Sequence, residues 1–256
     1  MLRVLASDLR KLFRDKTFLA SMEANVSYAL VIAVLLKIVK YFFIHESDLA
    51  AEDTCFTFQG ISIFLVTAST LFTTISEYSD GCIRNKIISG ARRHEVFLSA
   101  MICGMIQGLV HALIACFTSV LICFTLSSGF AILTAAEVIN YWLLTALVCV
   151  TLGGFTTSLI MILGKSRFSY ITGIALAVGM KIFSMEILDK LYPENGVCTL
   201  TGARLHIYLF FDRFVPYLHV TMPPHWPVAD YLAGNLGLLL LATAAGLVLF
   251  RKKELQ

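Results

Sequence analysis

The segment EYSDGCIRNKIISGARRHEVFLS, from Glu77 to Ser99, is a polar interruption between two apolar runs. About twenty almost uncharged residues precede it and nearly thirty follow it. A helix crosses the hydrocarbon core of a bilayer with ~20 mostly apolar residues. The pattern therefore predicts two membrane-spanning helices joined by a short polar connection.

The composition of the whole chain extends this reading to a polytopic membrane protein. Only 14% of the residues are charged and 58% are hydrophobic, whereas soluble domains carry roughly 25% charged residues. Six runs are long and apolar enough to span: 24–44, 56–76, 98–126, 138–163, 168–187 and 228–250. None alternates as a strand does, so we predict an all-α protein with six transmembrane helices. The spans leave no room for a separate catalytic domain, and residues 1–256 are expected to form one transmembrane domain.

The N-terminal segment 1–21 is expected to be an interfacial helix that precedes spans 1 to 5, which lie within 22–187. Leu2, Leu5, Leu9 and Leu12 recur at helical spacing among charged residues, which is typical of an amphipathic helix on a membrane surface. The charges also argue against a cleaved signal peptide. The alternative is a cytoplasmic helix packed on the other spans.

Basic residues indicate the orientation of the spans. With the N-terminus in the cytoplasm, most of the 20 lysines and arginines fall on the inner side, as the positive-inside bias requires. We therefore expect a plasma-membrane protein with both termini, and the segment 77–99, in the cytoplasm. Span 6 and a cytoplasmic tail form 228–256.

The long outer segment 188–227 separates spans 5 and 6. It contains the turn sequence PENG and the aromatic stretch HIYLFFDRFVPYLHV, which is too short and too charged to span. We expect an interfacial or re-entrant helix that breaks near Pro216. The alternative is a packed extracellular loop.

Two lysines inside predicted spans are candidates for a substrate path. Lys37 and Lys181 lie at similar depths in spans 1 and 5, where a charge at the bilayer centre costs ~2.5–3.5 kcal/mol. Either both reach the outer headgroups with their long side chains, or they line an outer vestibule that receives an anionic or amphipathic substrate.

Among the cysteines, only Cys55 and Cys198 are expected on the outer side. We consider a disulfide that ties the first outer loop to the last, with two free thiols as the alternative. No cysteine or histidine spacing resembles a zinc site.

The chain offers no catalytic centre that we can identify. LGKS, at 163–166, resembles the end of a phosphate loop, but Leu159 stands where that motif needs glycine. His111 is the only histidine well inside a span and has no partner for intramembrane proteolysis. We expect no enzyme activity, metal, cofactor or nucleic-acid partner on this chain; an intramembrane enzyme is the least favoured reading.

Within the opening segment, a short helix is predicted to lie across the cytoplasmic face. Ser79 and Asp80 are candidate N-caps, Ile83 and Ile87 are apolar at helical spacing, and Gly90 is a candidate helix end. The apolar side must bury against the bilayer surface or in a groove of a partner protein.

In this segment the sequence resembles the permease subunits of ABC-2 type transporters. An acidic residue, Gly-x-Ile-Arg-Asn-Lys, Ile-Ser-Gly and a basic pair carry the resemblance: Glu77, Gly81, Ile83, Arg84, Asn85, Lys86, Ile88, Ser89, Gly90, Arg92 and Arg93. The motif covers about twenty residues, and the architecture agrees over the whole chain. The small size is similar to permeases of peptide export and bacteriocin self-protection.

The resemblance implies a coupling helix that docks in a cleft of a separate ATPase chain, which would bind ATP and Mg. The implied contact residues are Glu77, Asp80, Gly81, Ile83, Arg84, Asn85, Lys86, Ile87, Gly90, Arg92 and Arg93. Two ATPase subunits and a second permease, identical or related, are implied as partners within the lipid bilayer. The expected substrate is a peptide or an amphipathic lipid-like molecule, bound where two permeases meet along spans 1, 2 and 5. The alternative function is a non-transporting membrane protein that sequesters a peptide or anchors a partner.

Overall fold

The structure is a computed structural model, which describes residues 1–256 except 46–48, 57, 128, 131, 165–166, 194–195, 197, 199, 219–224 and 254–256. The described residues form helices and connections without a strand. Along the chain these are α1 (Leu2–Leu12), α2 (Lys16–Val39), the π-helix η1 (Lys40–Ile44), α3 (Ala51–Cys55), α4 (Gln59–Ser79), α5 (Cys82–Ile88), α6 (Arg93–Leu126), α7 (Ala135–Leu163), α8 (Arg167–Leu191), α9 (Gly202–Phe214) and α10 (Val228–Lys252).

The predicted fold class is confirmed. Within the described ranges, six helices are long and apolar enough to cross a membrane: Lys16–Phe43, Ile61–Ser79, Arg93–Leu126, Ala135–Leu163, Phe168–Leu191 and Val228–Lys252. The chain is therefore an all-α polytopic membrane protein. Its spans coincide with the predicted ones, with ends shifted by several residues.

The largest shift is at the first span, which begins earlier than expected. Asp15 ends the short turn after α1, and its Oδ1 accepts hydrogen bonds from the backbone N–H groups of Thr17 (2.8 Å) and Phe18 (3.2 Å). A side-chain acceptor at this position satisfies donors that a helix start leaves free. The segment 1–21 therefore contains all of α1 and the first turns of α2.

Glycines bring the backbones of α6 and α7 into close contact. Gly104 and Gly108 lie one turn apart on α6, and Gly153 faces them from α7. A Cβ added to Gly153 would lie 2.1 Å from the carbonyl oxygen of Gly104, and one added to Gly108 would lie 2.1 Å from that of Cys149. Only glycine permits such an approach between backbones, as in the small-xxx-small contacts of membrane helices.

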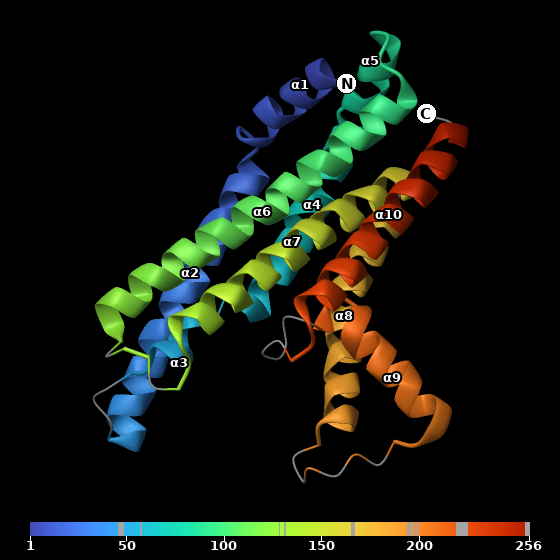
Figure 1. The fold of residues 1–256 in the computed structure, drawn as a ribbon. Coiled ribbons are helices and arrows are strands. Elements are labelled where there is room, and N and C mark those ends of the chain that lie inside the picture. Colours follow the sequence, from blue (N-terminus) through green and yellow to red (C-terminus); the bar gives the residue numbers. More distant parts are fainter. Residues whose placement is uncertain are drawn as a thin grey trace.

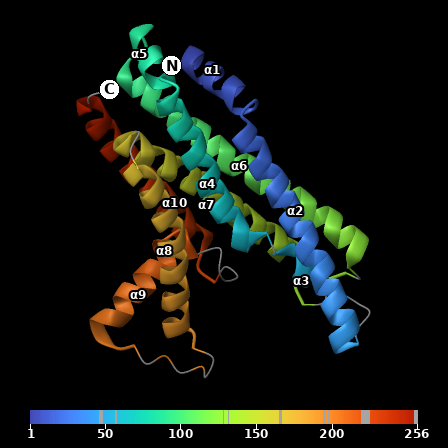
Figure 2. The same ribbon diagram turned by 180° about the vertical axis from the view of Figure 1, so that it is seen from behind.

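The other helices surround this pair. α10 and α4 pack on α7, while α1 and α2 pack on α6, and α4 lies between α2 and α8 (Figures 1 and 2). The start of α1, α5 and the end of α10 lie at one end of the bundle, and α3 and α9 lie toward the other (Figure 1). This arrangement agrees with the predicted placement of both termini and the 77–99 segment on one side.

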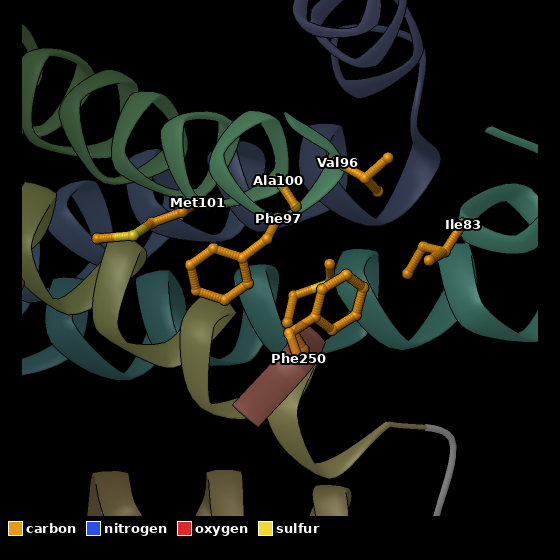
Figure 3. Packing of buried hydrophobic residues seen from close by; sticks show 7 residues of the cluster. Ile83, Val96, Phe97, Ala100, Met101 and Phe250 are labelled. Carbon is orange, nitrogen blue, oxygen red and sulfur yellow. The ribbon is translucent and has the colours of Figure 1, made fainter. Parts of the chain in front are cut away.

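A buried cluster anchors α5 to the bundle. Ile83 of α5 is 1% exposed and packs with Val96 and Phe97 of α6 and Phe250 of α10 (Figure 3). The rings of Phe97 and Phe250 lie 5.9 Å apart between centroids. The short helix is therefore part of the packed core at this end.

At the opposite end, the helix predicted around HIYLFFDRFVPYLHV is present as α9, which ends at Phe214, before Pro216. Asp212 is 2% exposed and is the centre of its polar contacts. Its Oδ2 accepts hydrogen bonds from the Tyr192 hydroxyl and the Trp226 indole N–H and lies close to His225 Nε2, each at 2.9 Å. These contacts join α9 to the end of α8 and the segment before α10. Whether α9 enters the membrane stays a prediction.

Candidate functional site

Two glycines set the ends of α5. Gly81 has φ of 67° and stands at the N-cap, and Gly90 has φ of 97° just after the helix. The Gly90 N–H donates to the Ile87 carbonyl oxygen (3.0 Å) and the Ala91 N–H to that of Lys86 (3.1 Å), which is the Schellman pattern. The predicted helix end at Gly90 is confirmed.

The predicted N-cap at Ser79 or Asp80 is wrong. Ser79 is the last residue of α4 and Asp80 is its C-cap. Because α4 continues to this point, the chain must turn sharply into α5, and the left-handed conformation at Gly81 makes that turn without the penalty of a Cβ.

A charged cluster attaches α5 to α1. Lys86 Nζ lies 2.6 Å from Asp8 Oδ1 and 3.0 Å from Glu77 Oε2. The Ser99 hydroxyl of α6 donates to the other oxygen of Asp8 at 2.5 Å. The Asp8 side chain is 3% exposed and the Lys86 side chain 16%, so one shared cation balances two carboxylates away from bulk water.

Lys11 closes the cluster on its outer side. Its Nζ donates to Cys82 Sγ at 3.2 Å and lies 4.0 Å from Glu77 and 3.8 Å from Asp80. Burial disfavours the charge of Lys86, but the Glu77 charge and the Asp8 hydrogen bond outweigh it and raise the pKa of Lys86. Burial also disfavours the charge of Lys11, but the hydrogen bond with Cys82 and the charge of Glu77 outweigh it and raise the pKa of Lys11. Both lysines are therefore held as cations.

The outward face of α5 carries different residues from the same motif. Arg84 and Asn85 are exposed, Ile88 is 71% exposed, and Arg92 is exposed beyond the helix. Ile83 and Lys86 face the bundle instead, and Ile87 is half-buried. The resemblance-derived contact set thus divides into an inner group that positions α5 and an exposed group that includes Arg84 and Asn85. Ile88, which belongs to the motif but not to the implied contact set, is exposed beside them, so a partner can reach all three.

The C-terminal end of α10 is tied to the same region. Arg93 Nη1 donates to the backbone oxygens of Arg251 and Lys253. Lys253 Nζ donates to the carbonyl oxygens of Met161 (3.1 Å) and Ile162 (2.8 Å), near the end of α7. Burial lowers the pKa of Lys253 to about 8. The start of α6 and the ends of α7 and α10 are therefore linked beside α5.

A small cavity lies beneath the charged cluster. Its volume is roughly 30 Å³, and its lining includes Asp8, Glu77, Cys103 and Gln107, which is space for about one or two water molecules. Polar contacts continue inward among α2, α4 and α6 through Thr73, Gln107, Ser69, Ser21, His111, Asn25 and Ser62. His111 thus bonds between helices, and no group of three metal-binding side chains occurs among the described residues.

The structure does not bring the two substrate-path candidates together within one chain. Lys37 is exposed on α2 and Lys181 is half-buried on α8. These helices flank α4 from opposite sides (Figure 2).

The considered disulfide between Cys55 and Cys198 is not formed, and all seven cysteines are free thiols. Cys55 is buried with its Sγ 3.0 Å from Cys123 Sγ. Cys198 is exposed, and its thiol donates to the Lys190 carbonyl oxygen at 3.5 Å. α3 packs on α6, whereas Cys198 follows α8, which lies on the other side of the bundle (Figure 1).

Sequence reasoning missed Asp8, Lys11 and Ser99. The charges of 1–21 fitted a helix on a membrane surface, so none was assigned a partner. One signal was available: Asp8 and Leu12 are four residues apart and share a helix face, so an acid lies beside the apolar stripe.

Matching the chain with models of known protein families gives no family, and no curated protein is similar to it.

Proposed function

We propose that the chain is the membrane-spanning subunit of an ATP-driven ABC-2 type exporter and that a separate chain hydrolyses ATP. The observation that carries the proposal is the division of α5 into two faces. One face is attached to α1, α4 and α6 by ion pairs and by Ile83, and the other presents Arg84, Asn85 and Ile88 to a partner. A coupling helix that transmits a partner's movement needs both a rigid attachment to the membrane helices and an exposed docking surface.

The orientation of this surface follows from charge. α5 and the ends of α1 and α10 lie at the end of the bundle where the basic residues concentrate (Figure 1). The positive-inside bias supports a cytoplasmic position for that end, where ATP and Mg would be available to the ATPase. The chain then resides in the plasma membrane with both termini cytoplasmic.

A second permease completes the proposed exporter. α2, α4 and α8 lie next to one another along one side of the bundle (Figure 2). α2 and α8 also carry exposed large apolar side chains, such as Leu35 and Ile174. Two such sides facing each other would enclose a path for a peptide or an amphipathic lipid-like substrate. Lys37 of one copy and Lys181 of the other would then line its outer part.

The test is purification of the tagged chain from its native membrane in mild detergent, followed by measurement of ATP hydrolysis and of the subunit masses. The wild type should bring down an ATPase with two copies of each chain. Arg84→Glu and Ile88→Glu should lose the ATPase, because they place charge on the docking face without touching the inner cluster.

Arg10→Glu is the matched control, since Arg10 is an exposed cation on α1 at the same end. It should retain the ATPase. An equal yield of ATPase from all four proteins would refute the docking face, and no ATPase from any of them would refute the exporter. A peptide recovered without an ATPase would favour the sequestering protein instead.

A further inference from the structure

Two thiols from different parts of the chain meet at the end of the bundle opposite α5. Cys55 ends α3 and Cys123 lies near the end of α6, and their sulfur atoms are 3.0 Å apart. A disulfide bond is ~2.05 Å long, so a movement of about 1 Å brings the sulfurs to bonding distance.

The surrounding contacts hold this pair in register. The Ala51 N–H at the start of α3 donates to the Gly129 carbonyl oxygen at 2.9 Å. Glu52 Oε1 accepts hydrogen bonds from the N–H groups of Ile132 (2.7 Å) and Leu133 (2.8 Å). At the other end of α3, the Trp142 indole N–H donates to the Cys55 carbonyl oxygen at 3.2 Å. α3 is thus attached to the connection between α6 and α7 and to α7 itself, independently of the thiols.

The two sulfurs differ in access. Cys55 is 0% exposed, whereas Cys123 is half-buried and lines a mostly apolar groove of about 490 Å³ together with Val120, Phe124 and Trp142. A reagent that enters the groove reaches Cys123 first. This is the arrangement of an attacking thiol with a resolving thiol behind it.

We propose that Cys55 and Cys123 are a disulfide-forming pair that attaches α3 covalently to the outer end of α6. The oxidant is a protein of the thiol–disulfide oxidoreductase class in the extracytoplasmic space. The Cys123 thiolate attacks a sulfur of its disulfide, which gives a mixed disulfide and releases one thiol. The Cys55 thiolate then attacks the Cys123 sulfur, which forms the Cys55–Cys123 bond and releases the second thiol. Two electrons and the two thiol protons pass to the oxidoreductase.

The proposal rests on the proposed orientation, which places α3 on the oxidising side of the membrane, and not on the ATPase. The proposed disulfide would also have a structural effect on α3. The bond would hold α3 along the groove between the outer ends of α6 and α7, where a reducing environment would leave it held by hydrogen bonds and apolar packing alone.

The experiment maps the thiols in native membranes. Membranes are treated with N-ethylmaleimide, and the chain is digested without reductant and analysed by mass spectrometry for peptides joined through Cys55 and Cys123. The joined peptide should be present and should disappear after dithiothreitol. Cys198→Ser should leave it unchanged, whereas Cys123→Ser should leave Cys55 unjoined.

The proposal would be overturned if N-ethylmaleimide alkylated both Cys55 and Cys123 in membranes that had not been reduced. A peptide joined through Cys55 and Cys198 would also overturn it. The purified chain in a buffer of oxidised and reduced dithiothreitol provides a second measurement that is independent of membrane orientation. There the pair should close in wild type and in Cys198→Ser, and failure to close would overturn the geometry itself. Association with an ATPase is read separately, so the two proposals can fail independently.

Discussion

Replacing Lys86 with methionine removes the cation that Asp8 and Glu77 share while keeping a side chain of similar length. The Lys86 Nζ atom lies 2.6 Å from Asp8 and 3.0 Å from Glu77, and all three side chains are at most 16% exposed. Breaking a buried ion pair by removing one partner costs ~3–5 kcal/mol. Because Ser99 still donates to Asp8 and Lys11 still lies near Glu77, we expect the lower value, about 3 kcal/mol.

This loss falls on the contact of α1 with α5 and α6, so it should appear as local opening rather than as global unfolding. Cys103 reports on that opening, because it is 7% exposed and lines the cavity beneath the cluster. The assay uses a chain in which Cys103 is the only remaining cysteine and measures its alkylation rate by a small maleimide in detergent. A free-energy change of 1.4 kcal/mol is tenfold, so Lys86→Met should label roughly 100-fold faster.

Arg84→Met is the matched control, since Arg84 lies two residues away on the exposed face of the same helix. Its rate should stay within about twofold, because surface substitutions are usually within ~0.5 kcal/mol. Adding Asp8→Asn to Lys86→Met should recover much of the protection, because it removes a buried charge that has lost its partner. Equal labelling of Lys86→Met and Arg84→Met, or no recovery in the double variant, would refute the reasoning.

Three further predictions concern other parts of the bundle. Gly153→Ala should lower Tm in detergent by the equivalent of ~1–3 kcal/mol, because its Cβ would lie 2.1 Å from the Gly104 carbonyl oxygen. Gly237→Ala is the control and should leave Tm unchanged, because its Cβ would meet nothing within 4 Å. Equal Tm values for the two variants would contradict the close contact. Burial lowers the pKa of Lys253 to about 8 from 10.5, so between these pH values the unfolded chain binds more protons than the folded chain and stability rises with pH. From pH 7.5 to 9.5 the Tm of wild type should therefore rise relative to that of Lys253→Met. Parallel Tm profiles for the two proteins would argue against a lowered pKa at Lys253. Asp212→Asn should lower the stability by about 2 kcal/mol and change the emission maximum of Trp226, because the indole N–H loses its charged acceptor; unchanged emission and Tm would exclude this role.

The sequence predicted the spans and the turn at Gly90 because their signals are local. A run of ~20 apolar residues has one low-energy arrangement in a bilayer, and a glycine after a polar helix has a strong tendency to end it. The pair Gly104 and Gly108 was also readable as a small-xxx-small spacing, and it marks the contact with α7.

The partners of charged and thiol groups could not be read in the same way. Asp8 and Lys86 are far apart in sequence, and only the packing of α1 on α6 brings them together. The position of Ser79 at the end of α4, rather than at the start of α5, depends on how far α4 continues. Topology predicts that Cys55 lies on the outer side, but it does not select Cys123 as the neighbour of Cys55.

The most direct test of the docking face is photocross-linking from α5 in native membranes. A photoreactive amino acid is placed at Ile88, which is 71% exposed, and in a separate chain at Ile83, which is 1% exposed. We expect an adduct between position 88 and an ATPase chain, with a yield that changes with nucleotide, and no such adduct from position 83. Adducts of position 88 with lipid alone, or equal ATPase adducts from both positions, would contradict it.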